Sequence, residues 1–540
     1  MVRKNLWLFL LLTFSLTGIA LGVWGFCKLG CHWTNSVYET IRLFVINPSS
    51  LLDNGISWQL QGARWLIFTA FVLFTFKLFF EILAPKFITE QTIKLFYRNH
   101  IIICGLNQIT INIIEKFENE KIIVLTQEEN LYAETLKAKG KKMIIGDFTD
   151  ENFWKKAKLK NASQLYAVID NDELNLKAIW SAFSYLESNK NRSKALRSFV
   201  LIKDRELKNI LEETTLFQYK TNVFDGSIFN INEMGIKYGI AMNMDKILPQ
   251  KMETAPKILL VGLTERTEIV LLNLAHCFTM NRENFHFTIV EKETEKIRSF
   301  QKKYAYLCGE KNDFVKIDFV AEIKPENQDS IIVCTENQLD AIKQAVQIRY
   351  MLGENKPDIL VFCNHSDTFS EVLEKETHAL KDKNITLIDL FAEIINYVFD
   401  LEKEKSRKIE EKAKEAHCFW SAIYQMNKEW DALSGHFKQS NRNQILDNHL
   451  KAYIALGQRF EDIKNCLISF SDNDKETLAI MEHRRWMLEK YENGWTLAPR
   501  NNEFKRHDCL IPWEDLSKEQ KSKDYNAIDL MIRLLNNPPK

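Results

Sequence analysis

The 540-residue sequence predicts an α/β protein with a pair of N-terminal transmembrane helices, two tandem Rossmann-like domains with doubly wound parallel sheets, and an all-α C-terminal domain. Two apolar runs, each roughly 20 residues long, lie in the first 85 residues. From about residue 98 to residue 402, short apolar runs alternate with helix-like segments, as in a parallel sheet covered by helices on both faces. After residue 402 the strand-like runs cease.

Composition disfavours some classes of partner. Lys and Arg together number 72, and so do Asp and Glu, so no net charge favours nucleic acid and we expect no DNA or RNA partner. The ten cysteines include no Cys-x-x-Cys pair, so we expect no metal site. Cys27 and Cys31 could form a disulfide on an oxidising membrane face, and the sequence leaves their redox state open.

The apolar runs, residues 5–26 and 65–84, predict two transmembrane helices. The first run is too long for a cleaved signal peptide. Basic residues precede the first run and follow the second, which places both ends of the pair in the cytoplasm: Arg3, Lys4, Lys86, Lys94 and Arg98. We therefore expect a transmembrane hairpin at 1–85, with an outer loop at 27–62, and a linker at 86–97.

Two further features bear on a pore. Lys77 and Glu81 are one helical turn apart within the second run, and we expect them to pair near its cytoplasmic end rather than to mark an ion path. The outer loop carries no Thr-Val-Gly-Tyr-Gly filter, whose carbonyls would replace the water around potassium, so a potassium-selective pore is disfavoured. The sequence neither supports nor excludes a non-selective pore.

The first sheet is expected within 98–250. Residues 99–117, NHIIICGLNQITINIIEKF, predict a buried strand, a glycine turn and an amphipathic helix. Five further strands are expected after it, at KIIVLT, KKMII, SQLYAVI, RSFVLIKD and TNVFDG.

The sequence of this segment resembles the TrkA-type nucleotide-binding domain, also called the regulator of potassium conductance domain. The opening IIICGLNQIT and the run GDFTDENFWKKAKLKNASQLYAVIDNDELNL carry the resemblance, which covers about 98–230. It implies a Rossmann fold that binds adenine nucleotides or NAD and that controls potassium channels and transporters.

The cofactor turn departs from that family. A Gly-x-Gly-x-x-Gly turn lets the backbone approach a pyrophosphate, but here only Gly105 of the three glycines remains, with Asn107 and Thr110 in the other places. Asp147 and Asp170 still end two strands, where ligands of open sheets bind. The candidate nucleotide residues are Gly105, Asn107, Asp147 and Asp170, and the alternative is a scaffold or dimerisation domain without bound NAD.

A second Rossmann-like domain is expected within 255–402. PKILLVGLTERTEIVLLNLAH repeats the strand, turn and helix, and five more strands follow at FHFTIV, FVKIDFV, SIIVC, DILVFC and ITLID. The turn keeps Gly262 alone; Arg266 could offset a phosphate there, and Glu291 ends the second strand, the place that holds a ribose. Neither domain carries a nucleophile elbow, a P-loop or a His-Glu-x-x-His motif, so we expect no catalytic residue and no enzyme activity.

Four helices are expected within 403–540. The segment EHRRWMLEKYENGWTLAPRNNEFKRHDCLIPWEDLSKEQKSKDYNAID resembles the repeat domain of ryanodine receptors over about 475–535. The residues that carry the resemblance are His483, Trp486, Gly494, Trp495, Lys505, His507, Leu510, Pro512, Trp513, Leu516 and Asp524. The whole chain resembles bacterial membrane proteins that join TrkA-type domains to such a repeat. This implies an inner-membrane location, with both termini cytoplasmic, and a role as a sensor or effector in defence.

This block combines the side chains that stack on a base with those that neutralise a phosphate. His483 and Trp486 share a helix face, and Gly494 allows the turn that returns Trp495 towards them. The candidate ligand residues are His483, Arg485, Trp486, Trp495, Arg500, Lys505 and His507. The alternative is that the indoles, Trp486 and Trp513 above all, form the core of a small helical domain.

Together these observations favour a membrane-anchored, cytosol-facing sensor that binds a nucleotide or a nucleotide-derived signal and forms a homo-oligomer. Its output would be a perturbed bilayer or a non-selective pore, as in an antiphage or stress effector. One alternative is a regulatory subunit of potassium transport that binds NAD or ATP. A nucleotide-processing enzyme is the least favoured, and no cofactor other than a nucleotide ligand is expected.

Overall fold

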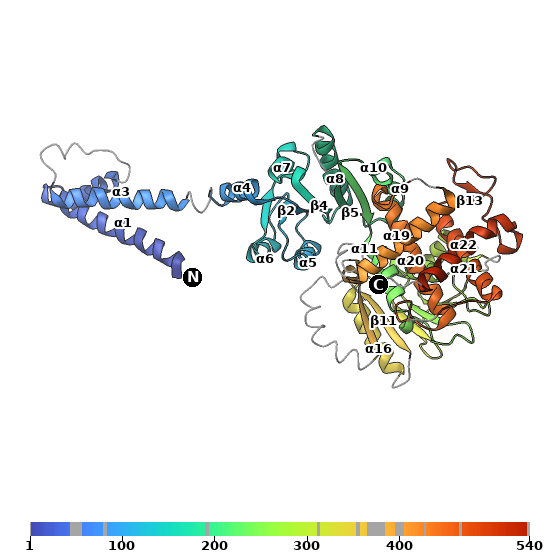
Figure 1. Cartoon of the computed structure of the whole chain (residues 1–540). Helices are drawn as coiled ribbons and strands as arrows, with labels where there is room; N and C mark the ends of the chain where they lie inside the picture. Colours follow the sequence, from blue (N-terminus) through green and yellow to red (C-terminus); the bar gives the residue numbers. More distant parts are fainter. Residues whose placement is uncertain are drawn as a thin grey trace. The chain divides into compact units, whose positions relative to one another are not determined.

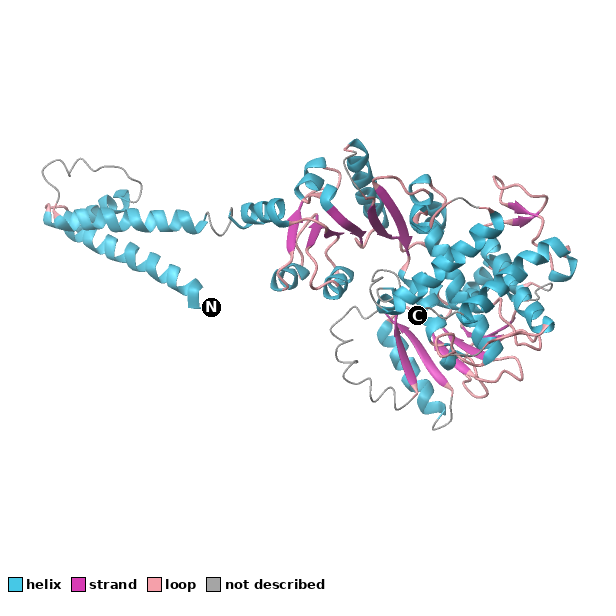
Figure 2. Ribbon diagram, viewed as in Figure 1, coloured by secondary structure: helices cyan, strands magenta, loops and turns pink. Residues whose placement is uncertain are grey.

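The computed structural model divides the chain into two compact units, 1–97 and 98–540 (Figure 1). The residues that the structure describes are 2–43, 57–78, 84–189, 194–309, 314–352, 357–363, 384–394, 404–425, 428–463 and 467–536. Every described strand belongs to the second unit, where Figure 2 shows the strands in magenta among cyan helices.

The N-terminal unit is helical. Its helices are α1 (Val2–Lys28), α2 (Trp33–Arg42), α3 (Trp58–Leu78) and α4 (Ala84–Phe96). α1 packs along α3, and glycines in α1 allow the close approach (Figure 1). A Cβ on Gly22 would lie 2.5 Å from Thr40 Cγ2, and one on Gly25 would lie 2.6 Å from Leu60 Cγ, so both positions favour glycine.

The expected transmembrane pair is not supported: among the described residues, no helix combines the length and the apolar character that crossing a bilayer requires. Residues 44–56 of the expected outer loop lie outside the described residues, as does Glu81 of the expected Lys77–Glu81 pair. Cys27 and Cys31 are both free thiols.

The first sheet has six parallel strands in the order β3-β2-β1-β4-β5-β6, which confirms the doubly wound sheet expected from the sequence. The strands are β1 (His100–Cys104), β2 (Ile122–Thr126), β3 (Lys142–Ile145), β4 (Ala162–Ala167), β5 (Leu196–Leu201) and β6 (Phe224–Phe229). The helices between them are α5 (Gln108–Lys116), α6 (Tyr132–Ala138), α7 (Glu151–Lys156), α8 (Asp172–Ser188), α9 (Arg205–Glu212) and α10 (Thr215–Gln218). β1 and β2 are buried along their whole length, as continuous apolar strands of a covered parallel sheet must be.

The second sheet repeats this topology, with the order β12-β11-β10-β7-β8-β9 and all strands parallel. Its strands are β7 (Lys257–Val261), β8 (His286–Val290), β9 (Lys316–Val320), β10 (Ser330–Val333), β11 (Asp358–Cys363) and β12 (Ile385–Asp389). Its described helices are α13 (Glu265–Leu274), α14 (Thr294–Lys303), α15 (Ala305–Cys308), α16 (Gln338–Leu352) and α18 (Leu390–Ile394). The prediction of two tandem sheets is therefore confirmed.

One helix is shared by the two sheet domains. α11 (Ile231–Met242), followed by α12 (Met244–Ile247), connects the sheets. Met234 and Tyr238 on α11 pack into the core of the first domain, and Ile236 and Ile240 pack into the core of the second. The domain boundary near 250–255 stays a prediction, but α11 has a face in each core and joins them mechanically.

The C-terminal region is helical, as expected, with α19 (Glu404–Tyr424), α20 (Gly435–Leu456), α21 (Asp472–Glu492) and α22 (Lys518–Asn536). The sequence did not predict the two-residue strands β13 (Thr496–Leu497) and β14 (Arg506–His507), which pair between α21 and α22. Strands this short leave no periodicity to detect.

α20 docks its first residue on the edge strand of the first sheet. The Gly435 N–H donates to Asp225 Oδ1 at 3.0 Å. A Cβ on Gly435 would overlap Ser227 Oγ, so only glycine allows this approach. The helical region therefore contacts the first sheet directly, while its core is continuous with that of the second domain.

We expect Gly235→Ala on α11 to lower the midpoint of thermal unfolding, although alanine favours a helix over glycine by about 1 kcal/mol. The new Cβ would lie 2.6 Å from the backbone oxygen of Leu390, which cannot rotate away, so overpacking should cost about 1–3 kcal/mol. Gly62→Ala on α3 is the matched control, because its Cβ would meet no atom closer than 3.5 Å. An unchanged midpoint for Gly235→Ala would contradict the close packing of α11.

Candidate functional site

The glycine turn of the first sheet is closed by its own side chains. Gly105 has φ of +112°, and a Cβ there would lie 3.0 Å from Ile169 N. Asn107 Oδ1 accepts the Thr110 N–H at 3.0 Å, and Asn107 Nδ2 donates to Val168 O at 2.6 Å. A first-turn N–H that a pyrophosphate would need is therefore already bonded. The residues present do not fit a dinucleotide at this turn.

Of the two aspartates predicted at strand ends, one is held by its own loop and the other pairs with the loop that follows β5. Asp147 is exposed and accepts the Thr149 N–H at 2.9 Å, and this backbone hydrogen bond lowers the pKa of its carboxyl. Asp170 pairs with Lys203, whose Nζ lies 3.3 Å from Asp170 Oδ1.

The turn of the second sheet is also self-capped. Gly262 has φ of +91°, and the side chains of Thr264 and Thr267 form a capping box at the start of α13. Glu291 Oε1 accepts the N–H groups of Lys292 and Glu293 at 2.7 and 3.0 Å, so its carboxylate is held by its own turn.

Arg266, predicted to offset a phosphate, is 5% exposed and points into the protein. Its Nη1 donates to Phe362 O at 2.8 Å and to Thr335 O at 3.2 Å, and its Nε donates to Asn232 Oδ1 at 3.3 Å. Burial lowers the pKa of Arg266. These bonds join α13 to α11 and to the carboxyl ends of β10 and β11, which leaves Arg266 less available to a phosphate than the sequence implied.

The end domain brings its aromatic residues together, as the sequence predicts. Neighbouring rings form a continuous array, with centroid distances of 6.0 Å for Trp513–His483, 5.8 Å for His483–Trp486, 4.8 Å for Trp486–His507 and 6.1 Å for His507–Trp495. Trp513 is buried at one end of the array, and Trp495 is partly exposed at the other. The array therefore runs from the core to the surface.

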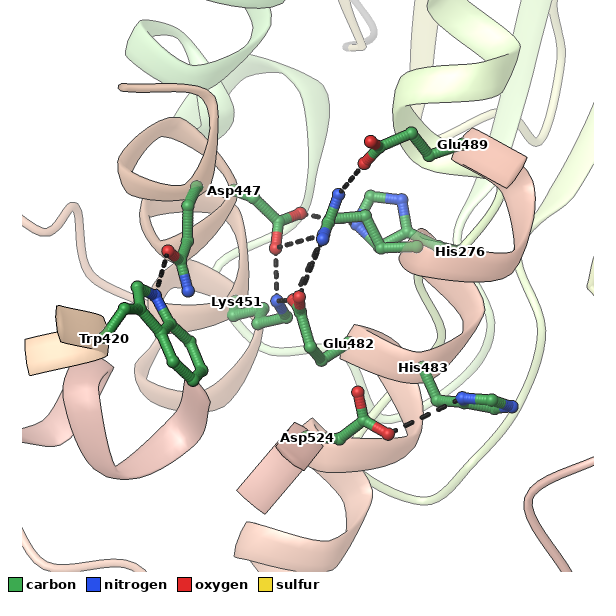
Figure 3. Close-up of polar contacts among 10 residues, drawn as sticks. His276, Trp420, Asp447, Lys451, Glu482, His483, Glu489 and Asp524 are labelled. Carbon is green, nitrogen blue, oxygen red and sulfur yellow. Dashed lines mark hydrogen bonds and ion pairs between the residues drawn. The ribbon is translucent and has the colours of Figure 1, made fainter. Parts of the chain in front are cut away.

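His483 belongs to the core part of the array. It is 3% exposed, its Nε2 donates to Ile511 O at 2.9 Å, and its Nδ1 lies 3.5 Å from Asp524 Oδ2 (Figure 3). Burial raises the pKa of Asp524, and the hydrogen bond with His483 acts in the opposite direction. With both ring nitrogens engaged, His483 positions α21 against α22 rather than facing a ligand.

Arg485 belongs to a buried ionic cluster. Its guanidinium bonds Glu482 at 2.8 Å and Glu489 at 2.7 Å and lies 3.8 Å from Asp447, while Lys451 pairs with both Asp447 and Glu482 (Figure 3). Burial alone would raise the pKa of Asp447, but Lys451, with His276 and Arg485, holds it well below its usual range. Arg485 is therefore committed to the fold, contrary to its predicted ligand role.

This cluster also reaches the second sheet domain. His276, which follows α13, directs Nε2 at Asp447 Oδ1 over 2.7 Å. Burial lowers the pKa of His276, so the neutral ring donates its N–H to the ionised Asp447. A residue of the second domain thus completes a cluster that otherwise lies in the helical region.

The surface end of the array combines an indole with three cations, and we call it the Trp495 site: Lys490, Trp495, Arg500, His507 and Lys523. Lys490 Nζ lies 4.4 Å from the centre of the Trp495 ring. Burial is the main cause that lowers the pKa of His507. Arg500, Lys490 and Lys523 lower it further and Asp508 raises it, so all three cations act on the ring that neighbours Trp495. Among the described residues, none of the three has a carboxylate within 4.0 Å.

Residues 507–509 offer a trio of metal-type ligands. The ligand atoms of His507, Asp508 and Cys509 lie within 4.8 Å of one another. However, His507 Nδ1 already accepts the Cys509 N–H at 3.0 Å, so its lone pair is engaged. A metal bound to Nδ1 would have to break that bond, so the trio does not fit a metal through this nitrogen.

Residues 101–215 match the TrkA-N domain family, and residues 462–537 match the RyR domain family. The chain joins a TrkA-N domain to an RyR domain. No curated protein matches it.

Several solved structures are similar to the chain. GsuK bound to ADP is 15% identical, with a TM-score of 0.37, over 75% of this chain and 99% of that one. The GsuK channel bound to NAD is 13% identical, with a TM-score of 0.38, over 75% and 85%. The human SLO3 gating ring is 9% identical, with a TM-score of 0.37, over 55% and 82%. At TM-scores below 0.5 these likenesses carry no argument about function.

The RyR domain is tied to the TrkA-N domain by a residue predicted to bind ligand. Lys505 Nζ lies 2.9 Å from Glu213 Oε1, just after α9, and donates to Asn493 O at 3.1 Å. Arg205, the first residue of α9, pairs with Glu492 at the end of α21. Two charged contacts therefore join α9 to the RyR domain.

Two cations of the Trp495 site, Lys490 and Lys523, were missed in the sequence. Lys490 lies four residues after Trp486, a spacing that places both on one helix face and could have identified it. The docking role of Arg484 was also missed. Its guanidinium lies 4.9 Å from the Phe278 ring and 5.1 Å from the Phe314 ring, both in the second sheet domain. No local pattern identifies partners so distant in the chain.

We expect Lys451→Met to lower the free energy of unfolding by about 3–5 kcal/mol, because it leaves the buried Asp447 and Glu482 with one cation fewer. Urea unfolding followed by tryptophan fluorescence measures this. The control is Lys475→Met, whose partner Asp529 lies 3.5 Å away in an exposed pair, and its cost should not exceed about 1 kcal/mol. Similar costs for the two variants would contradict the pairing.

The pH dependence of this difference has a definite sign. The pKa values of Asp447 and Glu482 are lowered in the folded protein, so the stability they contribute is present above their unfolded pKa values of about 4. It is lost as pH falls through the lower folded values. The difference between the wild type and Lys451→Met should therefore shrink between pH 7 and pH 3.

Proposed function

We propose that this protein is a nucleotide-responsive regulator in which the RyR domain holds the ligand and the TrkA-N domain receives the response. The observation that carries the proposal is the Trp495 site, where Lys490 lies over a partly exposed indole and Arg500 and Lys523 are exposed, all three without a carboxylate within 4.0 Å among the described residues. Cations that are left unpaired beside an aromatic face are what a base with a phosphate requires.

The chemistry assigns a role to each group. Lys490 covers one face of Trp495, and a base stacks on the other face, as on the aromatic platforms of single-strand binders. Arg500 and Lys523 are exposed and supply charge-assisted hydrogen bonds to phosphate oxygens. An anion near His507 would raise its lowered pKa, so binding should strengthen as pH falls.

The alternative is a regulatory subunit of potassium transport that binds NAD or ATP at the TrkA-N domain. The TrkA-N match and the strand order favour it. The closed turn at Asn107 disfavours it, because a pyrophosphate would have to displace that side chain. Titration with NAD separates the two: the alternative requires NAD binding that is kept in Trp495→Ala and is not weakened when the Asn107 side chain is removed.

We expect at least one member of a panel of mono-, di- and cyclic oligonucleotides to raise the unfolding midpoint of the full chain. At 100 times its Kd, a ligand adds about 2.7 kcal/mol. Trp495→Ala should weaken that ligand by about 1–3 kcal/mol, or roughly 5- to 150-fold, through lost stacking. Arg500→Gln should weaken it by about 1–2 kcal/mol, or roughly 5- to 30-fold.

Arg506→Gln is the matched control for Arg500→Gln. Arg506 is also basic and exposed, but its guanidinium lies 5.6 Å from the ring of Phe504. It should leave the affinity unchanged. A panel without a single stabilising member, or equal losses in the two arginine variants, would remove the Trp495 site from the proposal.

We further propose that the protein is a homo-oligomer and that it is held at a bacterial inner membrane with both termini in the cytoplasm. The apolar runs at 5–26 and 65–84 support the location, although no described helix has the length and apolar character of a membrane span. The ligand would then act on the bilayer. After fractionation, full-length protein should remain in the membrane pellet after a high-pH wash, and ligand should raise dye leakage from proteoliposomes. A chain that the wash removes from membranes refutes this location.

A further inference from the structure

Glu213 of the TrkA-N domain lies beside the Trp495 site. Its carboxylate pairs with Lys505 at 2.9 Å. Lys505 is not one of the residues that define the site, but the backbone oxygen of Lys505 accepts the N–H of Thr496, the residue after Trp495, at 2.9 Å. Glu213 also acts on Lys490: burial lowers the pKa of Lys490, Glu489 and Glu213 raise it, and Arg485 and Arg500 lower it further. One carboxylate of a neighbouring domain therefore faces two basic residues of the RyR domain, where a phosphate would also be attracted.

The helix that carries Glu213 is held at both ends. Arg205 begins α9 and pairs with Glu492, while Glu213 immediately follows α9 and pairs with Lys505. The two contacts differ in exposure. The side chains of Arg205 and Glu492 are 15% and 26% exposed, whereas those of Lys505 and Glu213 are 37% and 52% exposed. The second contact is the weaker one, because solvent screens exposed ion pairs.

α9 is also tied to the shared helix α11. Lys208 on α9 is largely buried, and its Nζ lies 3.0 Å from Glu233 Oε2 on α11. Burial alone would lower the pKa of Lys208, but Glu233 and Glu212 raise it, so the lysine stays charged and the pair persists. A displacement of α9 would therefore reach α11, which packs into the cores of both sheet domains.

We propose that Glu213 is an intramolecular occupant of the anion site, so that phosphate binding at the Trp495 site and the Glu213–Lys505 contact exclude each other. This rests on the proposed function and adds its regulation. In the free protein, Glu213 holds Lys505 and keeps α9 on the RyR domain. A bound phosphate takes Lys505 and repels Glu213, which frees the C-terminal end of α9. The coupling is reciprocal. If loss of the Glu213–Lys505 contact raises the affinity for the anion by some factor, a bound anion lowers the equilibrium constant for forming that contact by the same factor.

The test uses the full chain with inorganic pyrophosphate as the probe, so that it does not depend on which base the protein prefers. Affinity is measured by calorimetry, and the freedom of residues 205–213 by hydrogen exchange. Glu213→Gln should bind pyrophosphate two- to five-fold more tightly than the wild type, and its α9 should exchange faster before any probe is added. Glu206→Gln is the matched control: this exposed glutamate of α9 has no ion pair among the described residues, and its substitution should change neither reading.

Lys505→Gln separates two effects: it breaks the Glu213–Lys505 contact, but it leaves the Glu213 carboxylate, the proposed competitor of the anion, in place. It should free α9 as Glu213→Gln does, but it should not raise the affinity for pyrophosphate, because it also removes a cation. Binding by Glu213→Gln when the wild type does not bind would support the proposal strongly.

Equal pyrophosphate affinity in the wild type and Glu213→Gln would overturn the mutual exclusion, and nucleotide binding by the panel would still stand. A nucleotide that binds while neither protein takes pyrophosphate would also overturn it. If no nucleotide and no pyrophosphate binds either protein, the proposed function falls together with the inference.

Discussion

Paired charge in the protein interior is the constraint on which the rest of this structure depends. Asp447, Lys451 and Glu482 are buried between α20 and α21, where an unmatched charge would cost several kcal/mol, and the partly exposed Arg485 pairs with them from the edge. His276 completes the cluster from the second sheet domain. The cluster therefore fixes the RyR helix α21 on that domain, and the Trp495 site lies beyond it. A domain joined only by a flexible linker would not bury a charged cluster against its neighbour.

The same constraint explains why the basic residues of α21 divide into two sets. Arg484 and Arg485 point inward, onto two phenylalanine rings and onto buried carboxylates, and they hold domains together. Lys490 lies more than a turn further along, beyond the buried cluster, and its ammonium covers Trp495. Position along one helix thus decides whether a basic residue serves the fold or remains available to an anion.

The sequence allowed both sheets to be predicted, because fully buried parallel strands are continuous apolar runs and their glycine turns are visible. The loss of two glycines at Asn107 and Thr110 was also visible, and the hydrogen bonds of Asn107 give it a physical meaning. The fate of His483 and Arg485 could not be predicted. A histidine or arginine beside tryptophans gives the same sequence pattern whether its side chain is buried or exposed. Which of the two applies depends on distant partners, here Ile511 for His483 and Asp447 for Arg485. The contact between Glu213 and Lys505 joins segments far apart in the chain, which a single sequence does not reveal.

In the proposed function the ligand binds to the RyR domain and the response lies in the TrkA-N domain, so the coupling must pass through contacts between the two domains. A nearly complete switch needs about 5.5 kcal/mol of preference for one state. The exposed Lys505–Glu213 pair is worth at most about 1 kcal/mol, so releasing it alone cannot drive the change. Because α9 is joined to α11 through a largely buried lysine, and α11 packs in both cores, the remainder has to come from repacking along α11. Close-packed cores have few alternative arrangements, so under this proposal a small displacement of α9 would select between discrete arrangements rather than deform the cores gradually.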